Sequence, residues 1–274
     1  MLKTRIVTAI ILLALFLAAL FSLPGLGWSG LVVVMVMQGT AEWARLAKLQ
    51  GRAASVYWWL TLALMLGIVW FDASHIPSLH VFPHLLVYTV SALLWLIVVP
   101  TWLISGWQAR QPLLLACVGW AVLIPTGLAM MDLRAMNPWL LLGLMGLVWV
   151  ADIAAYFAGR KFGKTKLAPS ISPGKTWEGV IGAVFGVTVY VLLITRFGDA
   201  DIVHKILPAL LLASWLWVGL AVIGDLFESA IKRQAGVKDS GALLPGHGGL
   251  LDRIDALTST LPLAAMAILM QKLA

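Results

Sequence analysis

Apolar runs of about twenty residues follow one another along almost the whole chain, and the short segments between them hold most of the charged residues. A run of that length crosses a bilayer as a helix, because lipid offers no hydrogen-bond partner to an unpaired backbone group. The pattern predicts nine transmembrane helices, at residues 3–23, 26–45, 54–72, 82–104, 112–132, 137–159, 177–196, 205–231 and 254–273. The predicted fold is therefore an all-α, polytopic integral membrane protein.

Composition supports the same fold class. The chain is 61% hydrophobic and 11% charged, with a mean hydropathy of +0.97, which excludes an ordinary soluble domain. The first run follows Lys3 and Arg5 but lacks a small-x-small cleavage site, so we expect a retained helix. The single cysteine, Cys117, excludes an intramolecular disulfide, and we expect it to pack in its apolar run.

The two halves of the chain differ in their polar content. Residues 1–136 hold about five predicted helices and little that indicates chemistry, whereas residues 137–274 hold most of the clustered charges. We therefore expect the second half to carry the functional site.

Basic residues predict the orientation of the chain. With a cytoplasmic N-terminus, fifteen of the nineteen lysines and arginines fall in cytoplasmic segments, as is usual for membrane proteins. The loops at 160–178 and 232–253 are then cytoplasmic, and the C-terminus lies on the opposite side. The net charge of +7 reflects this topology and attraction to anionic headgroups or phosphates. It does not require nucleic acid as a partner.

The segment Ser229–Asp255 is the most informative part of the sequence. It crowds eight charged or histidine side chains around glycines in an otherwise apolar chain. Asp252 and Asp255 are three residues apart, about one helical turn, and glycines 248 and 249 allow a backbone to approach a ligand closely. One interpretation is a solvated loop that marks the cytoplasmic side. We favour the other, a place where a phosphate-rich ligand and a metal ion meet the membrane edge.

Ionisable residues inside predicted spans are a second indication, because they are costly in lipid. Asp152 lies eight residues before Arg160, about 12 Å from the end of its helix. Asp225, Glu228 and Lys232 recur at steps of three and four residues, which places them on one helical face. They could be interhelical pairs that hold a bundle together. Their similar depth favours instead a polar cavity open to the cytoplasm, where carboxylates and phosphate oxygens are the usual ligands of Mg²⁺.

The loop at 160–178 is a third indication. Ser172 followed by Pro173 predicts an N-cap with proline at the first helical position, and such a helix start presents free N–H groups to an anion. The run Gly-Lys-Thr at 174–176 is no Walker A motif, since the required upstream glycine is replaced by Pro169. The loop predicts either a phosphate site or an ordinary basic cytoplasmic loop.

Two further groups carry weaker signals. His75, His80 and His84 fall near the outer end of a span and could bind a metal, although histidines are common at interfaces. Glu42 and Arg45 are three residues apart near a helix end, where we expect a local pair.

The residues at 229–255 resemble, along their whole length, the motif of the phosphatidate cytidylyltransferase (CDP-diacylglycerol synthase) family. Residues 172–179, Ser-Pro-Gly-Lys-Thr-Trp-Glu-Gly, resemble a second patterned segment of that family. The resemblance implies transfer of a cytidylyl group from CTP to phosphatidic acid, with Mg²⁺ and release of pyrophosphate. It implies a bacterial cytoplasmic (inner) membrane and contact with membrane lipids, and it leaves a second cation and a homodimer open.

The resemblance also implies roles for individual residues. Asp225 and Asp252 would hold the metal. The catalytic group would comprise Asp225, Asp252, Lys232, Arg253 and Asp255. Substrate-binding positions would be Ser172, Lys175, Glu178, Asp152, Glu228, Arg233, Lys238, Asp239 and His247.

Two other classes of protein stay open. Another membrane transferase acting on lipid phosphates, such as a polyprenyl-phosphate transferase, would also need acids and cations at the cytoplasmic face. A cation transporter could use Asp152, Asp225 and Glu228 as an ion path, but it would not need the basic glycine-rich loop.

Overall fold

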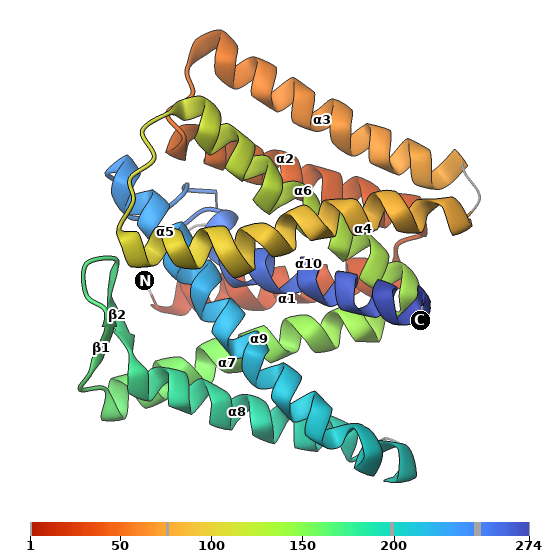
Figure 1. Ribbon diagram of the computed structural model, residues 1–274, viewed down its shortest axis with the longest axis vertical. Coiled ribbons are helices and arrows are strands. Elements are labelled where there is room, and N and C mark those ends of the chain that lie inside the picture. Colours follow the sequence, from red (N-terminus) through yellow and green to blue (C-terminus); the bar gives the residue numbers. More distant parts are fainter. Residues whose placement is uncertain (1, 75–76, 198–199, 244–247, 274) are drawn as a thin grey trace.

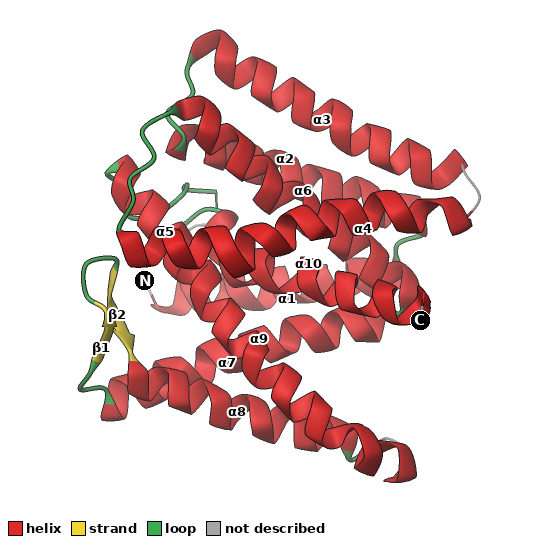
Figure 2. Ribbon diagram, in the orientation of Figure 1, coloured by secondary structure: helices red, strands yellow, loops and turns green. Residues whose placement is uncertain are grey.

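The computed structural model describes residues 2–74, 77–197, 200–243 and 248–273. It consists of helices and one short antiparallel hairpin (Figure 2). The elements in chain order are α1 (Leu2–Ser22), α2 (Gly25–Leu46), α3 (Gly51–Ser74), α4 (Pro77–Leu93), η1 (Leu94–Val98), α5 (Val99–Ser105), α6 (Pro112–Met136), α7 (Pro138–Phe162), β1 (Lys166–Ala168), β2 (Ser172–Thr176), α8 (Trp177–Thr195), α9 (Ala200–Ala235) and α10 (Leu251–Leu273).

Each of the nine predicted segments is helical over its described residues, except for the end residues Leu23, Asn137 and Arg196. The fourth consists of α4, the π-helical turn η1 and α5 in succession. Pro100, in the first turn of α5, has no N–H to donate, which accounts for the irregular turn before it.

Seven of the helical segments are long and apolar enough to cross a membrane, by length and composition. They cover α3, α4 to α5, α6, α7, α8, α9 and α10. α2 is not among them, because polar residues such as Gln38 and Glu42 occupy its last turns. The all-α membrane fold is confirmed, whereas the count of nine spans stays a prediction.

Successive helices run in alternating directions, so the connections gather at two ends of the bundle (Figure 1). The hairpin, the α5–α6 connection and the end of α9 lie at the left in this view, which we call the loop end. The end of α3, the start of α4 and the end of α10 lie at the right, which we call the far end. α6 and α10 form the interior, since 67% and 56% of their most apolar stretches are buried, against 17% for α3.

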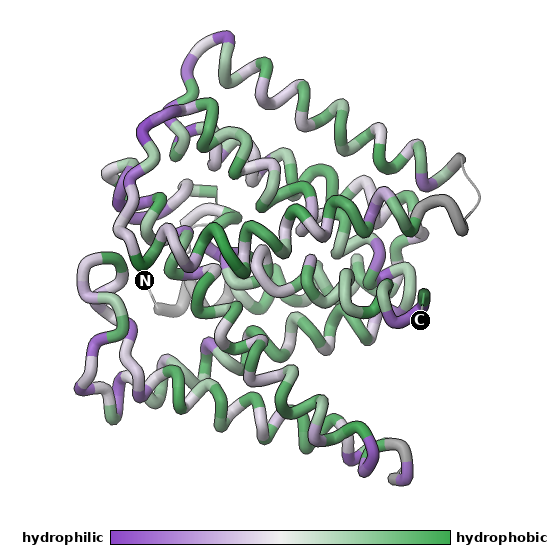
Figure 3. Tube along the Cα trace, in the orientation of Figure 1, coloured by the Kyte–Doolittle hydropathy of each residue, from purple (hydrophilic) through white to green (hydrophobic). Residues whose placement is uncertain are grey.

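The outer helices present apolar side chains to their surroundings. Large exposed hydrophobic residues line α3 and α8, including Trp59, Leu66, Ile181, Phe185 and Leu193. Hydrophobic positions run along the helices, and hydrophilic ones concentrate near their ends (Figure 3). Cys117 is also exposed, on α6, so the expectation that it packs inside is wrong. Such surfaces are stable against lipid, which makes this an integral membrane protein.

An aromatic cluster fixes α9 near the loop end. The ring of Phe227 lies 6.4 Å from Trp43 of α2, 5.6 Å from Trp95 of η1 and 5.4 Å from Trp102 of α5, between ring centroids. Edge-on ring contacts of this kind stabilise a defined geometry. They hold the part of α9 that carries Glu228, the next residue.

Small residues bring α7 and α8 into close contact. Gly182 and Gly186 of α8 face Ala158 and Ala154 of α7, where a larger side chain would clash. Further along α7, the Tyr190 hydroxyl donates to the Gly143 carbonyl at 3.0 Å. This close pair of helices carries the hairpin between them.

Candidate functional site

A cavity of about 450 Å³ lies at the loop end, between α7, β2, α8 and α9. Four of the predicted site residues line it: Asp152, Ser172, Lys175 and Asp225. Arg160 also lines it, and its guanidinium donates to the Tyr156 hydroxyl at 3.0 Å. The structure therefore brings the loop at 160–178 together with Asp152, which precedes it, and with Asp225, which lies fifty residues after Lys175.

The hairpin corrects one prediction from the sequence. Ser172 does not cap a helix, because residues 172–176 form β2, paired with β1. α8 starts at Trp177, as the predicted span 177–196 has it, which is four residues after the start implied by a Ser172 cap. Thr176 is its N-cap, accepting from the Gly179 N–H at 3.1 Å. Thr176 can serve because its extended backbone ends the strand and starts the helix at the same residue.

Lys175 reaches from this hairpin to α9. Its Nζ lies 2.5 Å from Oδ2 of Asp225, and both side chains are partly exposed to the cavity. Asp152 of α7 lies close enough to interact electrostatically with Asp225, Lys175 and Arg253. Cationic and anionic groups therefore meet in one cavity.

A second centre surrounds Lys232. Its Nζ lies 2.6 Å from Oδ1 of Asp252 and 3.2 Å from Oε1 of Glu228. Lys232 and Glu228 are buried, and they are neighbours at the four-residue spacing read from the sequence. The ammonium group joins the end of α9 to the first turn of α10.

Asp252 is held by backbone donors as well. Its Oδ2 accepts N–H groups of Ser240 at 2.9 Å and Gly249 at 2.8 Å. Gly248, with φ of 81°, takes a conformation that favours glycine, and a Cβ there would clash with the Asp252 carboxylate. The two glycines thus let the backbone approach the protein's own acids closely.

Glu42 is an acid that the sequence pattern assigned to a local pair with Arg45 and not to the site. It is completely buried on α2, and no ion pair among the described residues joins it to Arg45, so the expected local pair is wrong. Its carboxylate accepts instead from Ser240, Leu250 and Leu251. A signal was present, namely an acid among apolar residues in a predicted span, but its partners lie about two hundred residues away.

The remaining predicted site residues lie outside the cavity wall. Asp255 interacts electrostatically with Asp225, Asp152 and Lys232. Arg233 is exposed and donates to the Val237 carbonyl at 3.4 Å. Lys238, Asp239 and Arg253 are exposed. None of these five residues lines the 450 Å³ cavity.

Two further predicted substrate-binding residues are Glu178 and His247. Glu178 closes the hairpin by accepting from the Thr165 N–H, at 3.1 and 3.2 Å to its two oxygens. His247 lies outside the described residues. The assignment of substrate-binding residues stays a prediction.

The donor set at the loop end suits a divalent cation. Both Glu228 oxygens are buried and have no hydrogen-bond partner among the described residues, because the Lys232 ammonium meets Oε1 outside hydrogen-bond geometry. Asp225, Asp252 and Asp255 add carboxylates nearby on the same two helices. Carboxylate oxygens with free lone pairs are the ligands that Mg²⁺ prefers.

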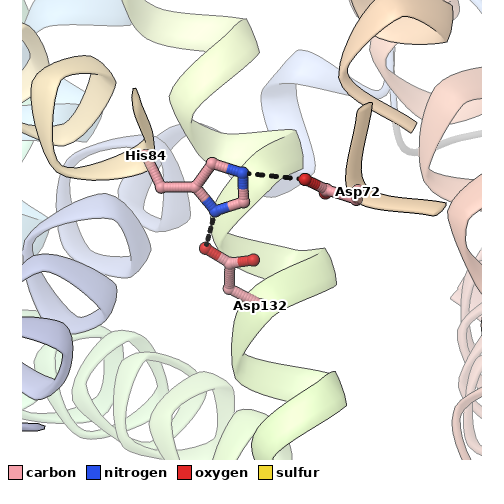
Figure 4. A group of neighbouring side chains, drawn as sticks. All are labelled: Asp72, His84 and Asp132. Carbon is pink, nitrogen blue, oxygen red and sulfur yellow. Dashed lines mark hydrogen bonds and ion pairs between the residues drawn. The ribbon is translucent and has the colours of Figure 1, made fainter. Parts of the chain in front are cut away.

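A different buried polar cluster lies at the far end (Figure 4). His84 of α4 is 3.1 Å from Asp72 of α3 through Nε2 and 2.9 Å from Asp132 of α6 through Nδ1. The Tyr88 hydroxyl donates to the same Asp132 oxygen at 2.7 Å. The three potential ligand atoms lie within 4.8 Å of one another, so these residues also form a donor set for a metal ion. His75 and the side chain of His80 lie outside what the structure describes.

Comparison with known proteins gives matches along the whole chain. The family model described as "Cytidylyltransferase family" matches residues 3–271. The phosphatidate cytidylyltransferase of Haemophilus influenzae is 35% identical over 96% of this chain and 96% of that protein. That of Pseudomonas aeruginosa is 38% identical over 97% of this chain and 96% of that protein. A relative of the same name from Thermotoga maritima is 44% identical over 42% of this chain and 44% of its own length.

Proposed function

The chain belongs to the cytidylyltransferase family, as the residues at 229–255 predicted, and we propose that it is the enzyme that makes CDP-diacylglycerol. It transfers the cytidylyl group of CTP to phosphatidic acid and releases pyrophosphate. The observation that carries the proposal is the meeting of Lys175 with Asp225, 2.5 Å apart in a cavity at the end of a membrane bundle. At that depth a lipid headgroup and a soluble nucleotide can meet.

The reaction depends on stabilising negative charge more than on proton transfer. A phosphatidate oxygen attacks the α-phosphorus of CTP, a new P–O bond forms, and the bond to the bridging oxygen of the pyrophosphate breaks. A phosphomonoester is largely dianionic at neutral pH, so the attacking oxygen needs no strong general base. The task of the protein is to bring two polyanions together and to stabilise the charge on the transferring phosphoryl group.

Lysines and arginines at the loop end are suited to that task. Lys175 and Arg160 line the cavity, and Lys232 lies seven residues after Asp225 on α9. Each would hold phosphate oxygens by charge-assisted hydrogen bonds. Lys175 is bonded to Asp225 here, so phosphate binding would exchange a carboxylate partner for a phosphate partner.

Mg²⁺ is the cation that we propose for this site. Asp225 and Asp252 would hold it, and Glu228, Asp255 and Asp152 would be further acids of the site. A bound ion would neutralise phosphate charge and orient the reacting groups. The unsatisfied oxygens of Glu228 support a cation at this place, and a second cation would find ligands among the same acids.

The apolar part of the cavity wall fits the lipid substrate. Ala151, Ala155, Val180, Ala183 and Val218 line the cavity together with the charged residues. A phosphatidate headgroup could enter beside these small side chains while its acyl chains stay in the bilayer.

A direct assay separates this function from its rivals. Purified protein with CTP, phosphatidate and Mg²⁺ should yield a CDP-lipid and pyrophosphate in equal amounts. ATP should hardly be used, because buried polar groups matched to one base are left unpaired with another. Turnover with a polyprenyl phosphate and none with phosphatidate would assign a different lipid enzyme. Cation flux in liposomes without any nucleotide product would assign a transporter.

We also propose that the loop end faces the cytoplasm of a bacterium, where CTP is made. The basic residues support this orientation. A cysteine replacing exposed Ala242 should be protected from an impermeant reagent in intact cells, whereas one replacing exposed Gln271 should be labelled. Cys117 must first be replaced by serine, because it is exposed. The opposite labelling pattern would reverse the orientation.

A further inference from the structure

Glu42 connects the first half of the chain to the candidate site. It lies on α2, it is completely buried, and three of its four hydrogen-bond partners are 198 to 209 residues away in the sequence. A buried carboxylate is costly unless its oxygens are hydrogen-bonded. The donors that bind Glu42 therefore indicate its structural role.

Both oxygens of Glu42 are used. Oε2 accepts the Ser240 hydroxyl at 2.8 Å and the Leu251 N–H at 3.0 Å. Oε1 accepts the Leu250 N–H at 2.9 Å and the Gln38 side-chain amide at 2.9 Å. Leu251 is the first residue of α10, so Glu42 satisfies donors that a helix start leaves free, and its negative charge suits that end of the helix dipole.

The same short segments also hold Asp252. Its Oδ2 accepts the N–H groups of Ser240 and Gly249, and the Ser240 hydroxyl oxygen lies 3.0 Å from it. That hydroxyl has one proton, and the shorter contact is to Glu42. Glu42 and Asp252 thus bind opposite sides of one backbone arrangement, in which a Cβ at Gly249 would clash with Ser240 and Glu42.

We propose that Glu42 is a positioning residue of the active site, which fixes residues 240 and 249–251 and thereby orients the Asp252 carboxylate. The proposal deepens the proposed function, since it assigns Asp252 to the metal site. Glu42 contacts neither substrate nor metal. It acts through Ser240 and the start of α10.

The test replaces Glu42 by glutamine, which has the same shape. The glutamine NH₂ group can only donate hydrogen bonds, so it replaces one of the two oxygens that accept them in Glu42. The matched control is Thr40→Val, which alters a buried polar side chain on the same helix whose hydroxyl donates to the Val36 carbonyl of α2 itself. Two readouts are compared on equal amounts of folded, monodisperse protein in detergent. These are the binding of Mn²⁺, measured by electron paramagnetic resonance, and the Mg²⁺ dependence of CDP-lipid formation.

We expect Glu42→Gln to weaken Mn²⁺ binding and to lower turnover at limiting Mg²⁺ by roughly 10- to 100-fold, as is typical of residues that orient metal ligands. High Mg²⁺ should restore part of the rate, and the KM for phosphatidate should change little. Thr40→Val should match the wild type in both readouts. Wild-type Mn²⁺ binding by Glu42→Gln, or equal weakening by Thr40→Val, would overturn the proposal.

If Glu42→Gln does not fold, Ser240→Ala is the test variant. It removes the hydroxyl between the two acids, and Glu42 keeps its other hydrogen bonds. We expect the same direction of change and a smaller size, and unchanged Mn²⁺ binding would overturn the proposal. The two hypotheses fail in different ways. Wild-type protein that makes no CDP-lipid refutes the proposed function, whereas the Mn²⁺ comparison between variants still decides the role of Glu42.

Discussion

The two buried polar clusters of this protein lie at opposite ends of the bundle and are satisfied to different degrees. At the far end, each ring nitrogen of His84 has a carboxylate partner, and Tyr88 adds a further donor. At the loop end, Lys232 serves two acids, and both oxygens of Glu228 are left without a hydrogen bond among the described residues. A cluster whose groups are already paired holds helices together, whereas buried acids with free lone pairs can take a ligand.

The cavities beside the two clusters differ in the polarity of their walls. A cavity of about 500 Å³ beside His84 is lined otherwise by apolar residues and glycine of α3, α4 and α6. The cavity at the loop end carries Asp152, Arg160, Lys175 and Asp225 on its wall. Phosphate groups bind to cationic side chains, and an apolar cavity wall provides none. The difference therefore favours the loop end as the place of chemistry.

The largest effect should come from the proposed metal ligands. Asp225→Asn and Asp252→Asn should each lower turnover by about 10³-fold or more, since a metal ion supplies several kcal/mol to phosphoryl transfer. CDP-lipid formation is measured against the amount of protein that elutes as a single species in detergent. Near-normal turnover at ordinary Mg²⁺ would remove that residue from the metal site and weaken the contrast between the two ends.

Lys175→Ala should have the next largest effect. We expect kcat/KM for CTP to fall by about 100-fold, as when one preorganised donor to a developing charge is removed. Lys161→Ala is the control, because Lys161 is exposed, is absent from the cavity wall and packs over Phe162. If both variants lost CTP use equally, the effect would reflect the basic charge of the loop rather than the Lys175 position.

Gly249→Ala tests the close packing at the loop end. Its Cβ would displace Ser240 or Glu42, and a small misplacement of a catalytic group lowers rate by about 10- to 100-fold. Gly67→Ala on α3 meets nothing within 4 Å and should leave activity unchanged. Assays of both variants at equal folded concentration compare the two regions. Full activity of Gly249→Ala would show that the loop tolerates the shift.

The smallest effect on turnover should come from His84→Ala, and its effect on stability should be large. Removing the imidazole leaves two partly buried carboxylates facing each other, which costs about 3 kcal/mol in comparable buried pairs. We expect a lower melting temperature in detergent and normal turnover per folded molecule. Loss of turnover without loss of stability would give the far end a role in catalysis and remove the distinction drawn above.

The sequence predicted the helical segments well because hydrophobic length decides a span without reference to distant residues. It also placed Lys232 beside Glu228, since a four-residue spacing on one helix makes neighbours wherever the helix packs. The predicted span 177–196 matches α8, but the N-cap at Ser172 was wrong. Ser-Pro suits a helix start locally, whereas the pairing of residues 166–168 with 172–176 extends the strand to Thr176. Pairing between strands is a contact that periodicity does not report.

The sequence alone therefore determined the membrane fold, the membership of the family and most of the candidate charged residues, because each of these depends on local pattern or on a contiguous motif. The tertiary structure decided which of them meet. It placed Lys175 on Asp225, joined Lys232 to Asp252 and brought Glu42 of α2 to the start of α10. Such contacts depend on how helices far apart in the chain pack, and a buried carboxylate shows its purpose only when the donors around it are known.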